Sequence, residues 1–202
     1  MKPLDRLLQR WRVRRAARWV RPGDRVLDVG CFDRTLATAL AGRAAHVTGV
    51  DPVAEPFRGD GIEILRGTVP GEPRLPAASF DCITLLAVLE HVPDPEALGR
   101  ECARLLRAGG RVIATVPHPF VDRLLAAGIR LRLLDGMEAE AHHGFEVERT
   151  PAIFARAGLQ LLREERFQLG LNRLFVFEKE APTGRSRRDP GDDRRNSRES
   201  VA

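Results

Sequence analysis

VLDVGCFDRTLA, residues 26–37, decides the fold of this chain. It opens in an apolar run of buried-strand type (25–30), turns at Gly30 and continues with helical apolar spacing over 36–40. A glycine after a buried strand lets the backbone come close to a ligand, and the N-terminus of the following helix offers free N–H groups and partial positive charge. The stretch therefore predicts a strand, a turn and a helix whose backbone can come close to a ligand.

The same alternation of strand and helix continues to Pro117. The helix between the last two of these strands is predicted from Asp94 as the cap, with Pro95 at the first position, to Leu106. Strands that alternate with helices indicate parallel βαβ units and a doubly wound α/β sheet covered on both faces. The predicted strands up to this point are 25–30, 46–51, 62–65, 81–89 and 111–116.

Beyond Pro117 the pattern changes. Residues 120–134 are predicted as helical and 135–149 as irregular, and Thr150 is predicted to cap a helix that ends near Gly158. Two further strands, 159–169 and 173–179, are separated by a short turn, which predicts a C-terminal antiparallel hairpin.

Length and composition predict one domain with tails. The chain has 202 residues, 43% of them hydrophobic, which is enough for one core. We divide it into a basic amphipathic helix (1–22), the α/β domain (23–180) and a disordered tail (181–202). No apolar run reaches the length of a membrane-spanning helix and no signal-peptide core is present, so a cytoplasmic protein is expected. The three cysteines form no CxxC pair, and no metal site is expected.

The positive charge lies at the two ends of the chain. The formal net charge is +5, yet residues 1–21 carry eight Lys or Arg against one Asp, and 181–202 carry six Arg against four acids, which leaves 22–180 at −4. This distribution argues against a nucleic-acid groove in the domain. The basic helix could contact a membrane surface, but packing on the domain is the favoured interpretation because Trp11 and Trp19 need burial.

Asp51 ends the second predicted strand about 20 residues after Gly30. An acid at this position can bind the two hydroxyls of a ribose, and both residues would face the crevice at the carboxyl ends of the strands. A nucleoside-type cofactor is therefore expected. A nicotinamide dehydrogenase would need a GxGxxG turn, of which only Gly30 is present.

Three ordered motifs resemble the class I S-adenosylmethionine-dependent methyltransferases, particularly the small type 11 domains. They are VLDVGC (26–31), FDCITLLAVLEHVPDPE (80–96) and LLRAGGRVIATVP (105–117). The resemblance implies a Rossmann-like, mostly parallel seven-stranded sheet closed by the hairpin, and S-adenosyl-L-methionine as cofactor. Phe32 and Arg34 stand where the family has its second and third glycines.

The resemblance also implies roles for single residues. Asp28 and Gly30, with Cys31 in the same loop, would lie beside the methionine end of the cofactor, Asp51 would hold the ribose, and Ala87 would flank the cofactor from the fourth strand. Near the third strand, the family often has an acid that accepts from the adenine amino group, and this chain has Thr68 and Val69 there.

The expected activity is methylation of a small-molecule acceptor at an oxygen, nitrogen or carbon. A hydroxyl acceptor needs a base, and the candidates are His91, after the fourth strand, and His142 and His143, in the segment where this fold commonly builds its acceptor pocket. Phe32 and Arg34 keep an alternative open, in which the chain is a catalytically inactive binding or regulatory protein with this fold.

Overall fold

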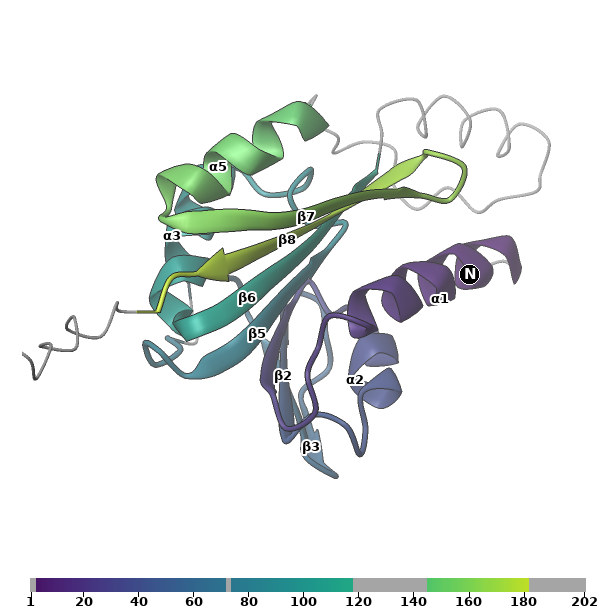
Figure 1. The fold of residues 1–202 in the computed structure, drawn as a ribbon. Helices are drawn as coiled ribbons and strands as arrows, with labels where there is room; N and C mark the ends of the chain where they lie inside the picture. Colours follow the sequence, from purple (N-terminus) through teal and green to yellow (C-terminus); the bar gives the residue numbers. More distant parts are fainter. Residues whose placement is uncertain (1–2, 72–73, 118–144, 182–202) are drawn as a thin grey trace, which may run out of the picture.

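The computed structural model describes residues 3–71, 74–117 and 145–181. It has three layers, in which one twisted sheet is covered by helices on both faces (Figure 1). The predicted helical segment 120–134 and all but the first residue of the predicted tail 181–202 lie outside the described residues, as do His142 and His143.

The sheet has eight described strands in the order β3-β4-β2-β1-β5-β6-β8-β7. The pairs within β4-β2-β1-β5-β6 are parallel, whereas β3 pairs antiparallel with β4, and β8 pairs antiparallel with both β6 and β7. The strands are β1 Arg25–Val29, β2 His46–Asp51, β3 Phe57–Gly59, β4 Ile62–Arg66, β5 Phe80–Leu86, β6 Leu106–Pro117, β7 Leu159–Phe167 and β8 Asn172–Lys179. The helices are α1 Pro3–Ala17, α2 Thr35–Ala39, α3 Pro95–Leu105, the 3-10 turn η1 Val147–Arg149 and α5 Thr150–Arg156.

The doubly wound α/β architecture and the C-terminal hairpin are confirmed. Each strand predicted from the sequence is present, and the structure adds the three-residue edge strand β3, which is too short for a periodic signal. The fourth predicted strand was expected to reach residue 89, but β5 ends at Leu86 because Ala87 has a left-handed backbone (φ 61°) that breaks the extended run.

Two apolar clusters explain why the central strands have continuous apolar sequences. In β1, Leu27 and Val29 belong to the cluster under α3 and α5, whereas Val26 belongs to the cluster under α1 and α2. Successive side chains of a strand point to opposite faces, so a strand covered on both faces must be apolar throughout. Asp28 is the buried exception in β1, and it lies at the carboxyl end of the sheet that positions the candidate site.

The start of α3 follows its sequence signature. The Asp94 side chain accepts a hydrogen bond from Ala97 N at 2.8 Å, and Pro95 occupies the first turn. The prediction for α5 was wrong in one detail. Thr150 lies inside the helix and Arg149 is the N-cap, because η1 runs directly into α5 and already supplies the helical backbone before Thr150.

The N-terminal helix α1 packs on the α2 side of the sheet (Figure 1). Val13, Ala16 and Val20 are buried in the cluster on that face. Trp19 is partly buried there, whereas Trp11 remains 40% exposed, so the expected burial holds for only one of the two tryptophans. No helix among the described residues is long and apolar enough to cross a membrane.

Candidate functional site

Gly30 holds the loop after β1 in a tight turn. Its backbone is left-handed (φ 71°), and its N–H donates to Val50 O at 2.8 Å. A Cβ built on it would lie 2.7 Å from Val88 Cγ2. Both the conformation and the space therefore require glycine, and the loop is held against β2 on one side and the residues after β5 on the other.

Gly30→Ala is expected to lower the free energy of unfolding by roughly 2–4 kcal/mol, since it combines left-handed strain with a steric clash. Denaturant unfolding of the single variants Gly30→Ala and Val88→Ala and of the double variant measures it. The double variant should be more stable than the sum of the two single effects, because removing Cγ2 relieves the clash. An unchanged unfolding midpoint for Gly30→Ala would contradict this account of the turn.

Asp51 connects the end of β2 to the same loop. Its carboxylate accepts hydrogen bonds from Phe32 N at 3.1 Å and from Val53 N at 2.9 Å, and the residue is only 7% exposed. Each carboxylate oxygen keeps a further lone pair for another donor. The structure thus brings Gly30 and Asp51 together at the carboxyl ends of two adjacent parallel strands, as predicted.

Asp28 is the buried acid of the site. Thr84 Oγ1 in β5 donates to its Oδ1 at 2.7 Å. Burial raises the pKa of Asp28 to about 7, and the negative charges of Asp33 and Asp51 act in the same direction, while the Thr84 hydrogen bond opposes them. Three acids therefore gather around this loop, and their combined charge favours a cationic ligand.

Cys31 packs into the sheet. A Cβ on Gly49 of β2 would lie 2.8 Å from Cys31 Sγ, so the thiol fills the space that this glycine leaves. Burial, followed by the charges of Asp28 and Asp51, raises the pKa of Cys31 to about 12. Such a thiol is not a nucleophile near neutral pH, and a cofactor contact of Cys31 would use its backbone.

Phe32 and Arg34 are directed away from the interior of the domain. Phe32 has a left-handed backbone (φ 44°), and the residue is 54% exposed. The Arg34 guanidinium lies over the Phe57 ring, 4.4 Å from its centroid, at the β3 edge of the sheet. The two departures from the family glycines therefore add no bulk to the core behind the loop.

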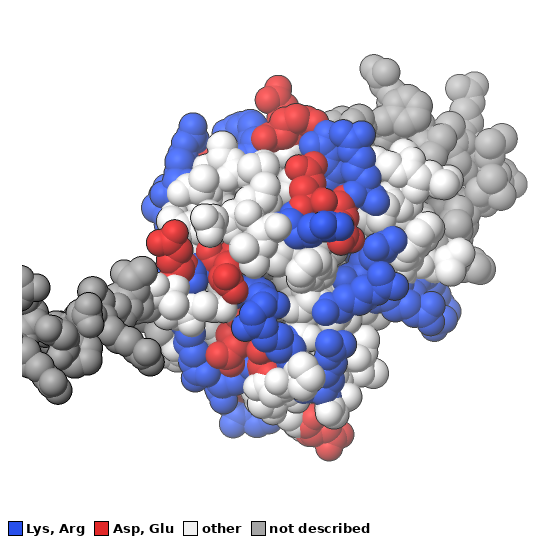
Figure 2. Space-filling view, viewed as in Figure 1, with Lys and Arg blue, Asp and Glu red and all other residues white. Residues whose placement is uncertain are grey.

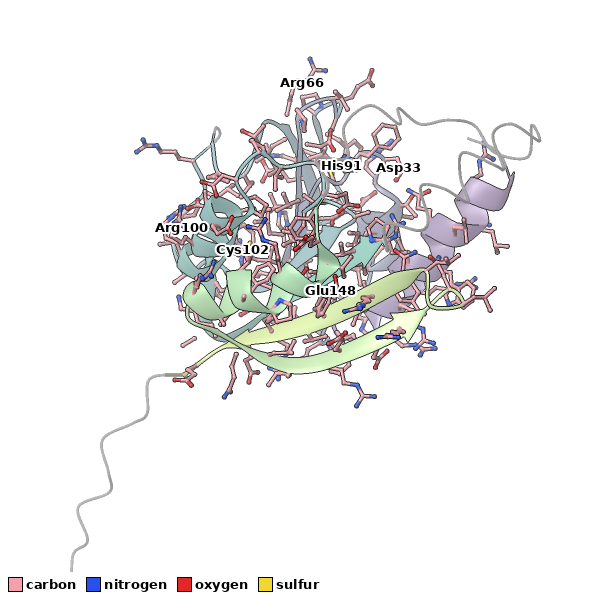
Figure 3. All side chains as sticks on the ribbon, turned by 90° about the horizontal axis from the view of Figure 1, so that it is seen from above. Asp33, Arg66, His91, Arg100, Cys102 and Glu148 are labelled. Atoms are coloured by element: carbon pink, nitrogen blue, oxygen red, sulfur yellow. The ribbon has the colours of Figure 1, made fainter. Side chains whose placement is uncertain are left out.

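The residues after β5 form the third side of the site. Ala87 N donates to Thr115 O at 2.9 Å, and the chain then turns so that His91 N donates to Val88 O at 2.9 Å. His91 is exposed, while Glu90 beside it is buried. Figure 3 shows Asp33 and His91, which follow β1 and β5, at the same end of the molecule as Arg66, the last residue of β4, and apart from Arg100 and Cys102 of α3.

Helix α1 supplies contacts that the sequence analysis missed. Gln9 Nε2 donates to both carboxylate oxygens of Asp33, at 3.1 and 3.2 Å. Burial lowers the pKa of Arg12, and the charge of Glu90 opposes that shift. Thr84 was missed too, because a threonine inside an apolar strand gives no signal of its own. Glu90 stands directly beside His91 in the quoted motif and could have been singled out as an acid after a buried strand.

Some predicted site residues remain outside this description. Two of the three candidate bases, His142 and His143, lie outside the described residues. Within the described part of the chain, no group of three His, Cys, Asp or Glu side chains is arranged to hold a metal ion.

The sequence of this chain is similar to known methyltransferases. A family described as "Methyltransferase domain" matches residues 3–164. A ubiquinone biosynthesis O-methyltransferase of Xylella fastidiosa is 40% identical over 114 residues, which is 52% of this chain and 45% of that protein. The chain thus spans about half the length of this curated relative.

Solved structures share the fold at low sequence identity. An S-adenosylmethionine-dependent methyltransferase from Mesorhizobium loti superposes with a TM-score of 0.62 at 18% identity, covering 82% of this chain and 96% of the other. The [4+2]-cyclase SpnF superposes with a TM-score of 0.66 at 14% identity, covering 84% of this chain and 80% of the other. At such identities the likeness shows the fold alone.

Proposed function

Because the chain belongs to the methyltransferase domain family, we propose that it transfers a methyl group from S-adenosylmethionine to a small-molecule acceptor. The observation that carries the proposal is the meeting of Asp28, Gly30 and Asp51 at the carboxyl ends of β1 and β2. We assign the methyltransferase domain to residues 23–180, with α1 packed against it.

The residues at this edge suit the cofactor. The Asp51 carboxylate has the remaining lone pairs to accept from two ribose hydroxyls, and Gly30 makes the turn that holds the loop beside the end of β2. The acids Asp28 and Asp33 suit the positively charged methionine end, and Ala87 lies after β5 on the flank of the same edge. When bound, the cofactor supplies an activated methyl group. The protein contributes orientation and exclusion of water, which can lower the barrier by up to ~7–11 kcal/mol.

We further propose that the acceptor atom is a hydroxyl oxygen. The Xylella relative is named an O-methyltransferase, and a hydroxyl must lose its proton during transfer. His91 is exposed near the carboxyl end of β5, where an imidazole can take that proton near neutral pH. His142 and His143 are the further candidate bases. The proposed acceptor is a small molecule, and no nucleic acid is proposed as a partner.

Isothermal titration of the full chain with S-adenosylhomocysteine tests the cofactor proposal, and micromolar affinity is expected. Transfer of a labelled methyl group from S-adenosylmethionine to a panel of small phenols and other hydroxyl compounds tests the activity. Binding without transfer to any acceptor would favour the alternative of an inactive binding protein. No binding even at millimolar concentration would overturn both the cofactor proposal and the proposed methyl transfer.

Variants separate the candidate bases. His91→Ala is expected to lower kcat while leaving the affinity for S-adenosylhomocysteine unchanged, and the double variant His142→Ala/His143→Ala serves as the matched comparison. If all three histidines can be replaced without loss of turnover, none of them is the base.

A further inference from the structure

The outward side of α1 carries an uninterrupted group of arginines. Arg6, Arg10 and Arg14 follow one another at intervals of four residues, so they form one row on the helix, and all three are exposed. Arg18 continues the row just beyond the helix end. Val13 and Ala16, on the side of α1 that faces the domain, are buried.

These arginines are available for a partner. Among the described residues, no acid forms an ion pair with Arg6, Arg10 or Arg14, whereas Arg15 on the flank of α1 pairs with Glu165 at 3.3 Å. Figure 2 shows the blue side chains gathered over α1. An exposed row of this kind attracts a surface of negative charge.

Large apolar side chains lie beside the arginine row. Leu7 and Trp11, four residues apart on α1, are 60% and 40% exposed. Leu169, in the turn between β7 and β8, is 96% exposed. This turn contacts the first part of α1, since Gln168 Nε2 donates to Leu8 O at 2.8 Å. We define the basic-apolar face as Arg6, Leu7, Arg10, Trp11, Arg14, Arg18 and Leu169.

We propose that the basic-apolar face docks on the surface of an anionic lipid bilayer. A helix that lies in a membrane interface combines arginines, which bind lipid phosphates, with Leu and Trp side chains that enter the boundary between headgroups and acyl chains. A nucleic acid would use the arginines but would leave Leu7 and Leu169 in water. The apolar residues therefore favour a bilayer over RNA.

The test is sedimentation of the full chain with vesicles of phosphatidylcholine alone and of phosphatidylcholine with phosphatidylglycerol. Binding is expected only to the anionic vesicles, and it should weaken as salt rises. Arg10→Gln/Arg14→Gln should lower the affinity about 25-fold, since each arginine near the surface contributes about fivefold. Arg58→Gln/Arg100→Gln, with the same change of charge on β3 and α3, should bind like the parent.

The apolar part is tested with Leu169→Ser. Leu169 is almost fully exposed, so the fold should tolerate the change, and the affinity for anionic vesicles should fall at least about tenfold. Equal binding to neutral and anionic vesicles, or equal loss in the Arg58/Arg100 control, would overturn the proposal. Unchanged vesicle binding by Leu169→Ser, together with equally tight binding of RNA, would also overturn it and indicate a general polyanion surface.

Discussion

Asp51→Asn is expected to weaken S-adenosylhomocysteine binding at least about 100-fold, because two charge-assisted hydrogen bonds to the ribose would be lost. The change acts on the protein as well. An amide has only one acceptor oxygen, so either Phe32 N or Val53 N would face an NH₂ group in place of a carboxylate oxygen. Isothermal titration gives the affinity, and thermal unfolding reports the change in the loop.

Asp60→Asn is the matched control for Asp51. Asp60 is an exposed acid in the turn before β4, where its left-handed backbone (φ 51°) is one that asparagine also tolerates. It should bind S-adenosylhomocysteine like the parent protein. If Asp51→Asn binds within about threefold of the parent, the ribose is held elsewhere and the assignment of Asp51 fails.

Asp28→Asn is expected to have opposite effects on stability and on cofactor binding. Burial keeps the folded carboxyl group protonated up to a pKa of about 7, whereas the unfolded chain loses this proton near 3.8. The folded state therefore holds more protons between these values, and the free energy of unfolding falls as pH rises from about 4 to 7 and is then constant. Asparagine carries no charge and can still accept from Thr84 Oγ1.

Above pH 7 the asparagine variant should thus be more stable than the parent by on the order of 1–4 kcal/mol, and this difference should vanish near pH 4. Its affinity for S-adenosylmethionine, whose sulfur is positively charged, should fall. Denaturant unfolding at several pH values measures the first effect, and titration measures the second. A stability difference of equal size at pH 4 and pH 8 would refute the role given to ionisation.

Thr84→Val separates the hydrogen bond from the charge. It keeps the Asp28 carboxyl group but removes the Thr84 hydroxyl, whose hydrogen bond favours the ionised form. The pH dependence of stability should therefore persist, and its upper limit should move to higher pH because the folded pKa of Asp28 rises further. In Asp28→Asn the same dependence should be absent.

The sheet could be predicted from the sequence because most of its determinants are local. RVLDVG (25–30) and HVTGVD (46–51) are mostly apolar runs that end at a glycine or an acid. β2 has the predicted bounds, and β1 ends one residue earlier than predicted, at Val29. The end of β5 and the edge strand β3 could not be predicted. Ala87, which ends β5, is a non-glycine residue with a positive φ, and Phe57–Gly59 forms a strand through its pairing with β4. Tertiary contacts decide such short segments.

The arrangement of residues at the carboxyl ends of β1 and β2 was only partly predictable. Gly30 and Asp51 follow from the position of each residue at a strand end. The link from Gln9 to Asp33, 24 residues apart, depends on where α1 packs, and no periodic pattern encodes it. The raised pKa of Asp28 also depends on its burial depth and on three neighbours from different segments.

The position of β8 has a consequence for biosynthesis. β8 lies between β6 and β7, although β7 leaves the ribosome first. Until residue 179 has emerged, β6 has an open hydrogen-bonding edge, and β7 lacks the one described strand with which it pairs. Nascent chains at this stage present two strands, β6 and β7, without their partner β8, and are therefore prone to aggregate or to recruit a chaperone.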